Sequence, residues 1–197
     1  MNLAHHITLF LCKKNILPED KCALYEYSLN ILLSTILHIG LSMCIGIAFN
    51  MIKESLLLFI SFFLIRKVAG GFHASTFLSC LFFSVFINIV ALNLILIAKE
   101  KEISLLFISV LPTIIIYFFA PIASPNKPMN DAEIKYFKLI SKIISTIICV
   151  SSFATYKFLS PIIGISIGIG LAIEAFSLVM AKIYFKIKHL FKNGDVL

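Results

Sequence analysis

Long apolar runs separated by short polar segments dominate the chain. Most of them approach the roughly 20 residues with which a helix crosses about 30 Å of hydrocarbon. They lack the alternation of polar and apolar residues that marks the strands of a membrane β-barrel. The pattern therefore predicts an all-α, polytopic membrane protein with about six transmembrane helices. The predicted spans are residues 30–50, 54–65, 77–98, 103–123, 138–157 and 159–181.

Two of these features set limits on the prediction. The run 54–65 is the weakest span, because it is short and has Lys53 and Glu54 at its outer end. Ahead of the first span, residues 3–14 place their apolar side chains on one helical face, which predicts an amphipathic helix on the inner membrane surface, ended by Pro18. We treat residues 1–197 as one membrane domain, with an N-terminal region (1–29), a transmembrane bundle (30–181) and a basic tail (182–197).

Composition agrees with a membrane protein. Of the 197 residues, 60% are hydrophobic, and the mean hydropathy is +1.02, which leaves too little polar surface to cover a globule in water. The cations of the first amphipathic stretch, Lys13 and Lys14, follow its apolar residues instead of preceding them, so a cleaved signal peptide is not expected.

Charge predicts the orientation. The chain carries 17 Lys and Arg against 10 Asp and Glu, a formal net charge of +7. Six spans put both termini on one side, together with thirteen of the cations, and only Lys53, Lys99, Lys101 and Lys157 fall on the other. The positive-inside rule then predicts a multi-pass cell-membrane protein with both termini in the cytoplasm. The charge attracts either anionic lipid head groups or an acidic partner. Nucleic acid is not an expected partner, because the cations are scattered along the membrane edges.

Five cysteines occur without a CxxC pair and without metal-type spacing. Disulfides are not expected in a chain whose termini face the cytoplasm. Four of the cysteines are interpreted as small hydrophobic residues, namely Cys12, Cys22, Cys44 and Cys149. His73 and Cys80 would supply only two of the four ligands that zinc takes. Neither a metal nor another cofactor is predicted.

Cys80 differs from the other cysteines through its neighbours in the stretch "LIRKVAGGFHASTFLSCLFF", residues 64–83. A cysteine nucleophile needs a base and is helped by nearby positive charge. His73 supplies a base, and Arg66 and Lys67 supply charge. Gly71, the second of two adjacent glycines, permits backbone conformations and close approaches that other residues do not. The alternative is that the cations and the histidine are interfacial anchors and the cysteine fills space.

Geometry limits the catalytic interpretation. In one continuous helix, His73 and Cys80 would share a face but lie about 10.5 Å apart along the axis, too far for a hydrogen bond. Either the helix begins after His73, or the loop folds back, or the contact forms across a homodimer.

The pattern Arg66-x4-Gly71-x-His73-x6-Cys80, with the wording "AGGFHA", resembles the active-site segment of the accessory gene regulator B (AgrB) family. The stretch "APIASPNKPMN", residues 120–130, is similar to a proline-containing inner loop of that family. One segment departs from the family pattern: "YSLN", residues 27–30, has Asn30 where many members carry Glu or Gln. Asn30 either donates a hydrogen bond to the substrate or is an ordinary interfacial polar residue.

The resemblance implies a membrane cysteine endopeptidase of Gram-positive quorum sensing, with its active site near the cytoplasmic face. Its substrate would be an AgrD-like autoinducing-peptide precursor, which loses its C-terminal tail and is cyclised to a thiolactone or lactone through a thioester on Cys80. His73 would move the proton, and Gly71 would let the loop approach the substrate. Arg66 either holds a substrate carboxylate or stabilises the thiolate, or else its side chain only reaches to the lipid head groups.

Further candidates lie outside this stretch. Glu174 is an acid deep within a predicted span, where it would orient His73, pair with a cation, bind substrate or pack against Ser166 or Ser177. The resemblance implies an acidic tail on the precursor, which would be recruited by the inner-face cations Lys127, Lys135 and Lys138; the alternative is that these lysines anchor the loop to anionic lipid. A rival interpretation of the whole chain is a small transporter or peptide-export partner, in which Cys80 is incidental.

Overall fold

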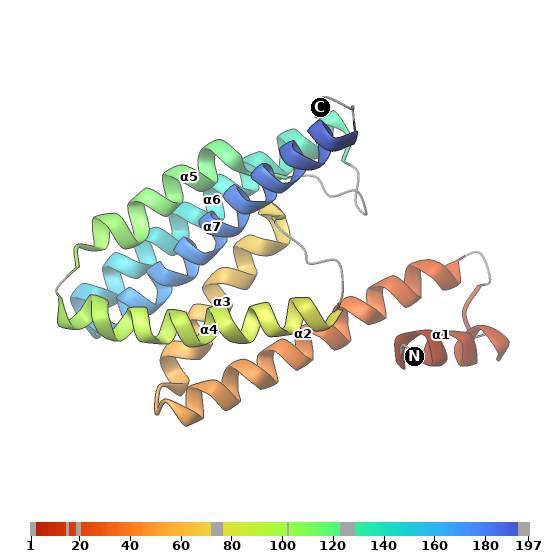
Figure 1. Ribbon diagram of the computed structural model, residues 1–197, viewed down its shortest axis with the longest axis horizontal. Helices are drawn as coiled ribbons and strands as arrows, with labels where there is room; N and C mark the ends of the chain where they lie inside the picture. Colours follow the sequence, from red (N-terminus) through yellow and green to blue (C-terminus); the bar gives the residue numbers. More distant parts are fainter. Residues whose placement is uncertain are drawn as a thin grey trace. The chain divides into compact units, whose positions relative to one another are not determined.

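The computed structural model describes residues 3–14, 16–18, 21–71, 77–101, 103–122 and 129–192. Within these ranges the chain is helical and has no strand, which confirms the predicted all-α fold (Figure 1). The elements are α1 (Leu3–Lys13), α2 (Cys22–Ala48), α3 (Ile52–Ala69), α4 (Phe77–Glu100), the π-helix η2 (Leu106–Val110), α5 (Leu111–Phe119), α6 (Asp131–Phe158) and α7 (Pro161–Lys192). They form two compact units, Met1–Leu41 and Ser42–Leu197.

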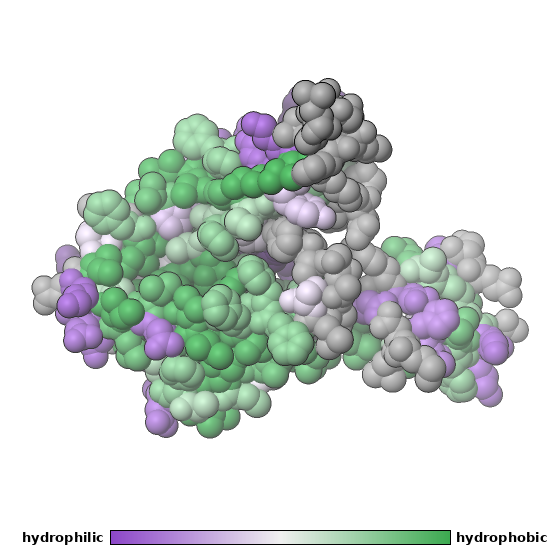
Figure 2. Space-filling view, viewed as in Figure 1, coloured by the Kyte–Doolittle hydropathy of each residue, from purple (hydrophilic) through white to green (hydrophobic). Residues whose placement is uncertain are grey.

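Four of the described helices are long and apolar enough to cross a membrane: α2, α4, α6 and α7. The prediction that the chain is a membrane protein is therefore confirmed, whereas the count of six spans stays a prediction. The run Phe107–Phe119 is shorter, and α3 carries charged residues near both ends. Large apolar side chains such as Phe82 and Phe86 are exposed on α4, and hydrophobic residues cover most of the visible surface over α4 and α5 (Figure 2).

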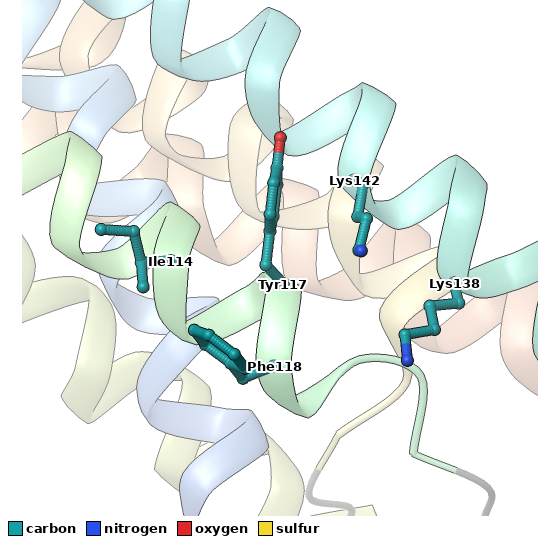
Figure 3. A pocket seen from close by; sticks show the side chains of 5 residues that line it. All are labelled: Ile114, Tyr117, Phe118, Lys138 and Lys142. Atoms are coloured by element: carbon teal, nitrogen blue, oxygen red, sulfur yellow. The ribbon is translucent and has the colours of Figure 1, made fainter.

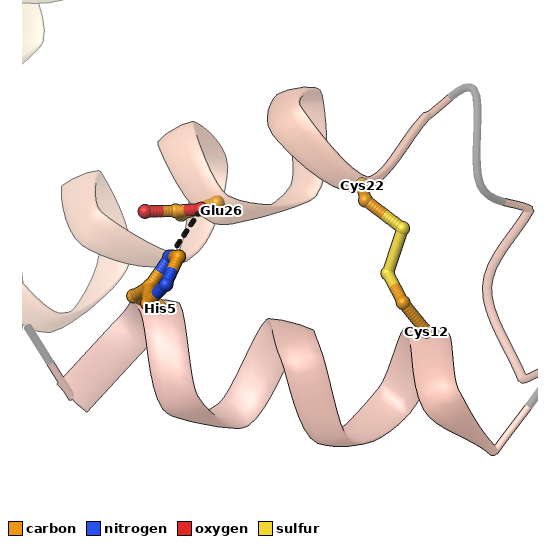
Figure 4. Close-up of polar contacts among 4 residues, drawn as sticks. All are labelled: His5, Cys12, Cys22 and Glu26. Carbon is orange, nitrogen blue, oxygen red and sulfur yellow. Dashed lines mark hydrogen bonds and ion pairs between the residues drawn. A yellow bond between two sulfur atoms is a disulfide. The ribbon is translucent and has the colours of Figure 1, made fainter.

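In the first unit, α1 is joined to the start of α2 by two contacts. Cys12 and Cys22 form a disulfide, with Cα atoms 6.5 Å apart, and His5 Nδ1 lies 3.0 Å from Glu26 Oε2 (Figure 4). The expectation that these two cysteines stay unpaired is wrong. It was based on the predicted compartment, whereas the short connection between α1 and α2 brings the end of one helix beside the start of the next.

In the second unit, α7 lies among the other helices and contacts α3, α4, η2, α5 and α6. Small residues permit these contacts. A Cβ atom added at Gly164 would lie 2.6 Å from the carbonyl oxygen of Ser152 on α6. One added at Gly170 would lie 1.9 Å from Ser61 Oγ and 2.8 Å from the carbonyl oxygen of Leu58, both on α3. Close backbone approach through small residues is typical of helices that associate in lipid.

Buried hydroxyl groups connect the helices of this unit. Ser55 Oγ on α3 lies 2.9 Å from Ser42 Oγ on α2, and Asn88 on α4 donates to the same Ser42 oxygen at 2.7 Å. A second pair links η2 to α6 through Ser109 Oγ and Ser152 Oγ, 2.8 Å apart. Buried polar groups away from water need such partners, and these bonds fix which helices are neighbours.

The contact between α3 and α7 gives a first prediction. Gly170→Ala should lower the free energy of unfolding by about 1–3 kcal/mol, because the new methyl group meets a backbone oxygen of α3 that cannot rotate away. Thermal unfolding in detergent measures the effect. The control is Gly40→Ala on α2, where an added Cβ has no atom within 4 Å, so that no loss is expected. Equal melting temperatures for the two variants would contradict this packing.

Candidate active site

The candidate site begins where α3 ends. Its last turn carries Arg66 and Lys67, and the N–H of Gly70 caps the helix by donating to the carbonyl oxygen of Arg66 at 3.2 Å. Gly70 has φ of 76° and Gly71 has φ of 129°. Other residues rarely adopt such angles, so the two adjacent glycines let the chain turn sharply out of the helix.

This turn is held against the end of α5. Gly70 and Ile122 form an isolated parallel bridge, in which the N–H of Ile122 donates to the carbonyl oxygen of Ala69 at 2.9 Å. A Cβ atom at Gly70 would lie 2.4 Å from the carbonyl oxygen of Ile122. The end of the Gly70–Gly71 turn and the residue that follows α5 and Pro121 are therefore held together, just before segments 72–76 and 123–128 in the sequence. The predicted residues His73 and Lys127 belong to these segments and lie outside the described residues.

The Arg66 side chain connects this turn to α7. Its Nη1 donates to the carbonyl oxygen of Gly70 at 3.0 Å and also to Ser177 Oγ. The same nitrogen lies 3.7 Å from Glu174 Oε2. Gly71 covers the guanidinium so closely that a Cβ atom there would lie 1.9 Å from Nη1. Three residues predicted from the sequence, Arg66, Gly71 and Glu174, are thus brought together.

Glu174 is fully buried on α7. Apolar residues of α3, α5 and α7 form the core at this level, among them Ile65, Ile116, Leu171 and Leu178. Among the described residues, neither carboxylate oxygen has a hydrogen-bond partner, so its compensating interaction there is the ion pair with Arg66. Of the roles considered for Glu174, pairing with a cation of another helix is the one found. Ser166 instead donates to the carbonyl oxygen of Ile162 on its own helix.

Cys80 lies in the first turn of α4, which begins at Phe77. The described part of the helix begins at Phe77, and His73 lies outside the described residues, so the three arrangements considered for His73 and Cys80 stay predictions. The thiol is free and half-buried, and Ser84 Oγ donates to the Cys80 carbonyl oxygen at 2.9 Å.

The remaining predicted residues lie elsewhere. Asn30 is half-buried on α2 in the first unit. Lys135 and Lys138 are exposed near the start of α6, where a capping box fixes the first turn: Glu133 N–H donates to Asn130 Oδ1 at 2.8 Å, and Asn130 N–H donates to Glu133 Oε2 at 3.0 Å. No group of three His, Cys, Asp or Glu residues within the described ranges is arranged to hold a metal ion.

Two shallow grooves flank the end of α5. One has a volume of about 330 Å³ and is lined by Ile114, Tyr117 and Phe118 of α5 with Lys138 and Lys142 of α6 (Figure 3). The other is lined by Phe119, Pro121, Ile122, Lys182, Phe185 and Lys186. The Nζ atom of Lys142 lies 5.4 Å from the Tyr117 ring centroid, and that of Lys182 lies 4.4 Å from the Phe119 ring centroid. Lysines of α6 and α7 thus surround the end of α5.

Sequence reasoning missed two partners at this end of the unit. It did not connect Ser177 to Arg66, or Tyr117 to the lysines of α6. The only signal for Ser177 is its spacing of three residues from Glu174, which places both side chains on one face of α7.

Comparison with known protein families matches residues 4–178 to the family described as accessory gene regulator B. The chain belongs to that family. The accessory gene regulator protein B of Staphylococcus aureus (strain MRSA252) is 27% identical over 147 residues, 75% of this chain and 79% of the relative. That of Staphylococcus haemolyticus (strain JCSC1435) is 24% identical over 153 residues, 77% and 81% of the two chains. Protein FsrB of Enterococcus faecalis (strain ATCC 47077 / OG1RF) is 26% identical over 162 residues, 76% and 66%. No solved structure matches.

Family membership confirms the resemblance drawn from the stretch 64–83. The match to the family includes the helices that carry Arg66, Cys80 and Glu174, because the matched residues run from α1 into α7. The matched length also includes the two segments that leave the Gly70–Ile122 bridge.

The Gly71 contact gives a second prediction. Gly71→Ala should displace the Arg66 guanidinium, since the new Cβ atom would lie 1.9 Å from Nη1 in a backbone conformation that alanine disfavours. Hydrogen–deuterium exchange in detergent should be faster for the amides of residues 66–71 than in wild type. Gly40→Ala is again the control and should leave their exchange unchanged. Wild-type protection in Gly71→Ala would contradict the described contact.

Proposed function

We propose that this protein is a membrane-embedded cysteine endopeptidase that removes the C-terminal tail of an AgrD-like autoinducing-peptide precursor and promotes cyclisation of the product. The observation that carries the proposal is the position of Cys80. Its free, half-buried thiol lies in the first turn of α4, just after the segment that leaves the Arg66-bound turn. The chain also carries the motif that resembles the active-site segment of the family to which it belongs.

The proposed chemistry uses two residues. His73 takes the proton of the Cys80 thiol, and the sulfur attacks the scissile carbonyl carbon. The carbon–nitrogen bond then breaks, and His73 returns the proton to the leaving amine. The precursor's own cysteine or serine attacks the resulting thioester, loses its proton to His73 and forms the ring. Cys80 leaves as the thiolate and regains that proton.

The surroundings favour cyclisation over hydrolysis. Ser177, which accepts from Arg66, precedes Lys182 by about 7.5 Å along α7, so the Arg66 turn lies inward of the lysines that surround the end of α5. A site recessed from bulk water slows loss of an acyl group to hydrolysis. The half-buried position of the Cys80 thiol would likewise keep the acyl group partly out of water.

The same end of the second unit is rich in cations. Lys135, Lys138, Lys182 and Lys186 are exposed there, whereas Lys53, Lys99 and Lys101 flank the opposite ends of the helices. The positive-inside rule supports a cytoplasmic location for this cation-rich end, at which α7 ends. An acidic precursor tail would be attracted to the same face.

The proposal predicts that Cys80→Ala inserts into the membrane and folds but cleaves no precursor, because correct positioning alone does not replace a missing nucleophile. Mass spectrometry of purified protein mixed with precursor in detergent measures cleavage. The matched controls are Cys44→Ala and Cys149→Ala, which remove the other free thiols and should each retain activity. Wild-type-like cleavage by Cys80→Ala would refute the proposed peptidase.

The proposal also predicts how the lysines of the 127–138 region act. Lys127→Gln/Lys135→Gln/Lys138→Gln should raise KM for the precursor more than it lowers kcat, because recruitment precedes bond breaking. Each exposed pair contributes no more than about 1 kcal/mol, so single replacements should have little effect. Initial rates over a range of precursor concentrations in neutral detergent give both constants.

The matched control neutralises three lysines at the other end of the bundle, Lys53, Lys99 and Lys101, and should leave KM unchanged. Added salt should raise KM of the wild type, because surface charges are screened over about 10 Å at 0.1 M ionic strength. If the 127–138 triple variant has the wild-type KM in lipid-free detergent, these lysines serve only to anchor the loop to lipid.

A further inference from the structure

We propose that Glu174 is a positioning residue, which acts through Arg66 to fix the backbone turn from which the segment carrying His73 departs. This inference rests on the proposed function. According to this inference, Glu174, a fully buried acid on α7, affects a reaction that is carried out by His73 and Cys80, between the end of α3 and the start of α4. The juxtaposition that supports it is the ion pair between Arg66 and Glu174 beside the Gly70–Gly71 turn.

The contacts make one connected path. Glu174 Oε2 lies 3.7 Å from Arg66 Nη1, and that nitrogen donates to the carbonyl oxygen of Gly70 at 3.0 Å. Ser177, one turn further along α7, accepts from the same nitrogen. Gly71 lies directly over the guanidinium. A shift of the arginine side chain would therefore break or distort its hydrogen bond to the Gly70 carbonyl oxygen. The Gly70–Ile122 bridge would transmit this change from the turn to the end of α5.

The energetics argue that the pair serves more than stability. Glu174 has no exposed surface, Arg66 exposes 16% of its side chain, and the surrounding core is apolar. Removing two charges from water is unfavourable, and replacing a buried pair by packed apolar residues is often neutral or stabilising. A leucine pair would thus be compatible with folding, but it would not hold the Gly70 carbonyl oxygen.

Arg66 is the only residue through which Glu174 reaches the turn in the contacts of the described residues. Glu174 is therefore expected to affect the rate of the chemical step and not the initial binding of the precursor. Misplacement of reacting groups by about 1 Å lowers the rate about 100-fold. We expect a fall of that order in kcat, with KM within about threefold of the wild type.

The experiment compares three variants in detergent: Glu174→Gln, Arg66→Leu/Glu174→Leu and the exchanged pair Arg66→Glu/Glu174→Arg. For each we measure the melting temperature, kcat and KM with the precursor, and hydrogen–deuterium exchange of residues 66–71. Glu54→Gln changes the half-buried acid in the first turn of α3 and is the control expected to match the wild type in all measurements.

We expect the leucine pair to melt no more than about 4 °C below the wild type, and Glu174→Gln to melt lower than the leucine pair, because it leaves the largely buried Arg66 charge unpaired. Both variants should have kcat reduced about 100-fold and faster exchange at residues 66–71. The exchanged pair keeps both charges but moves the guanidinium to α7, so it should not restore kcat. Wild-type kcat in Glu174→Gln, in the folded leucine pair or in the exchanged pair would overturn the proposal, because the ion pair would then be only structural.

Hydrogen exchange separates this inference from the proposed function. If the wild type does not cleave the precursor, the peptidase proposal fails, and the exchange rates alone decide whether Glu174 positions the turn. Faster exchange at residues 66–71 in Glu174→Gln would then support the positioning role. Unchanged exchange in that variant would overturn it.

Discussion

The close approach of α3 to α7 is the constraint on which the rest of the second unit depends. Lipid tails are as apolar as leucine, so helices in a membrane associate through close packing and polar contacts. At Gly170 the contact includes a carbonyl oxygen and a hydroxyl group of α3. This proximity brings Arg66 within reach of Glu174 and Ser177. A wider separation of the two helices would leave a buried carboxylate with no compensating charge, which is far more costly than a gap in an apolar core.

Through the same arginine, the packing of α3 against α7 determines the geometry of the turn that follows α3. Because one nitrogen of Arg66 contacts α7 and the carbonyl oxygen of Gly70, the orientation of α3 against α7 sets the direction in which the chain leaves α3. The bridge to Ile122 extends this to the end of α5. Gly70 and Ile122, which are far apart in the chain and precede the segments that contain His73 and Lys127, are therefore held side by side.

This arrangement suits the chemistry proposed for Cys80. An acyl group that must pass from one sulfur or oxygen to another benefits from a site with little water, whereas recruitment of a charged peptide benefits from an exposed cationic surface. The second unit contains both a half-buried thiol and an exposed cationic surface. The half-buried thiol lies in the first turn of a membrane-length helix, and the exposed lysines of α6 and α7 lie around the end of α5.

The sequence by itself determined the helices and the local motif. The predicted run 77–98 lies within α4, and the motif that contains Arg66, Gly71 and Cys80 lies in one short stretch, because hydropathy and motif spacing are local properties. Hydropathy did not predict that α7 continues to Lys192, since a helix extends beyond its apolar part. Only the tertiary structure decided that Cys12 pairs with Cys22 and that Arg66 meets α7 at Ser177, 111 residues away. The physical reason is that such pairs depend on how helices pack and on the angle at which each presents its side chains, and neither quantity is set by the residues of one helix alone.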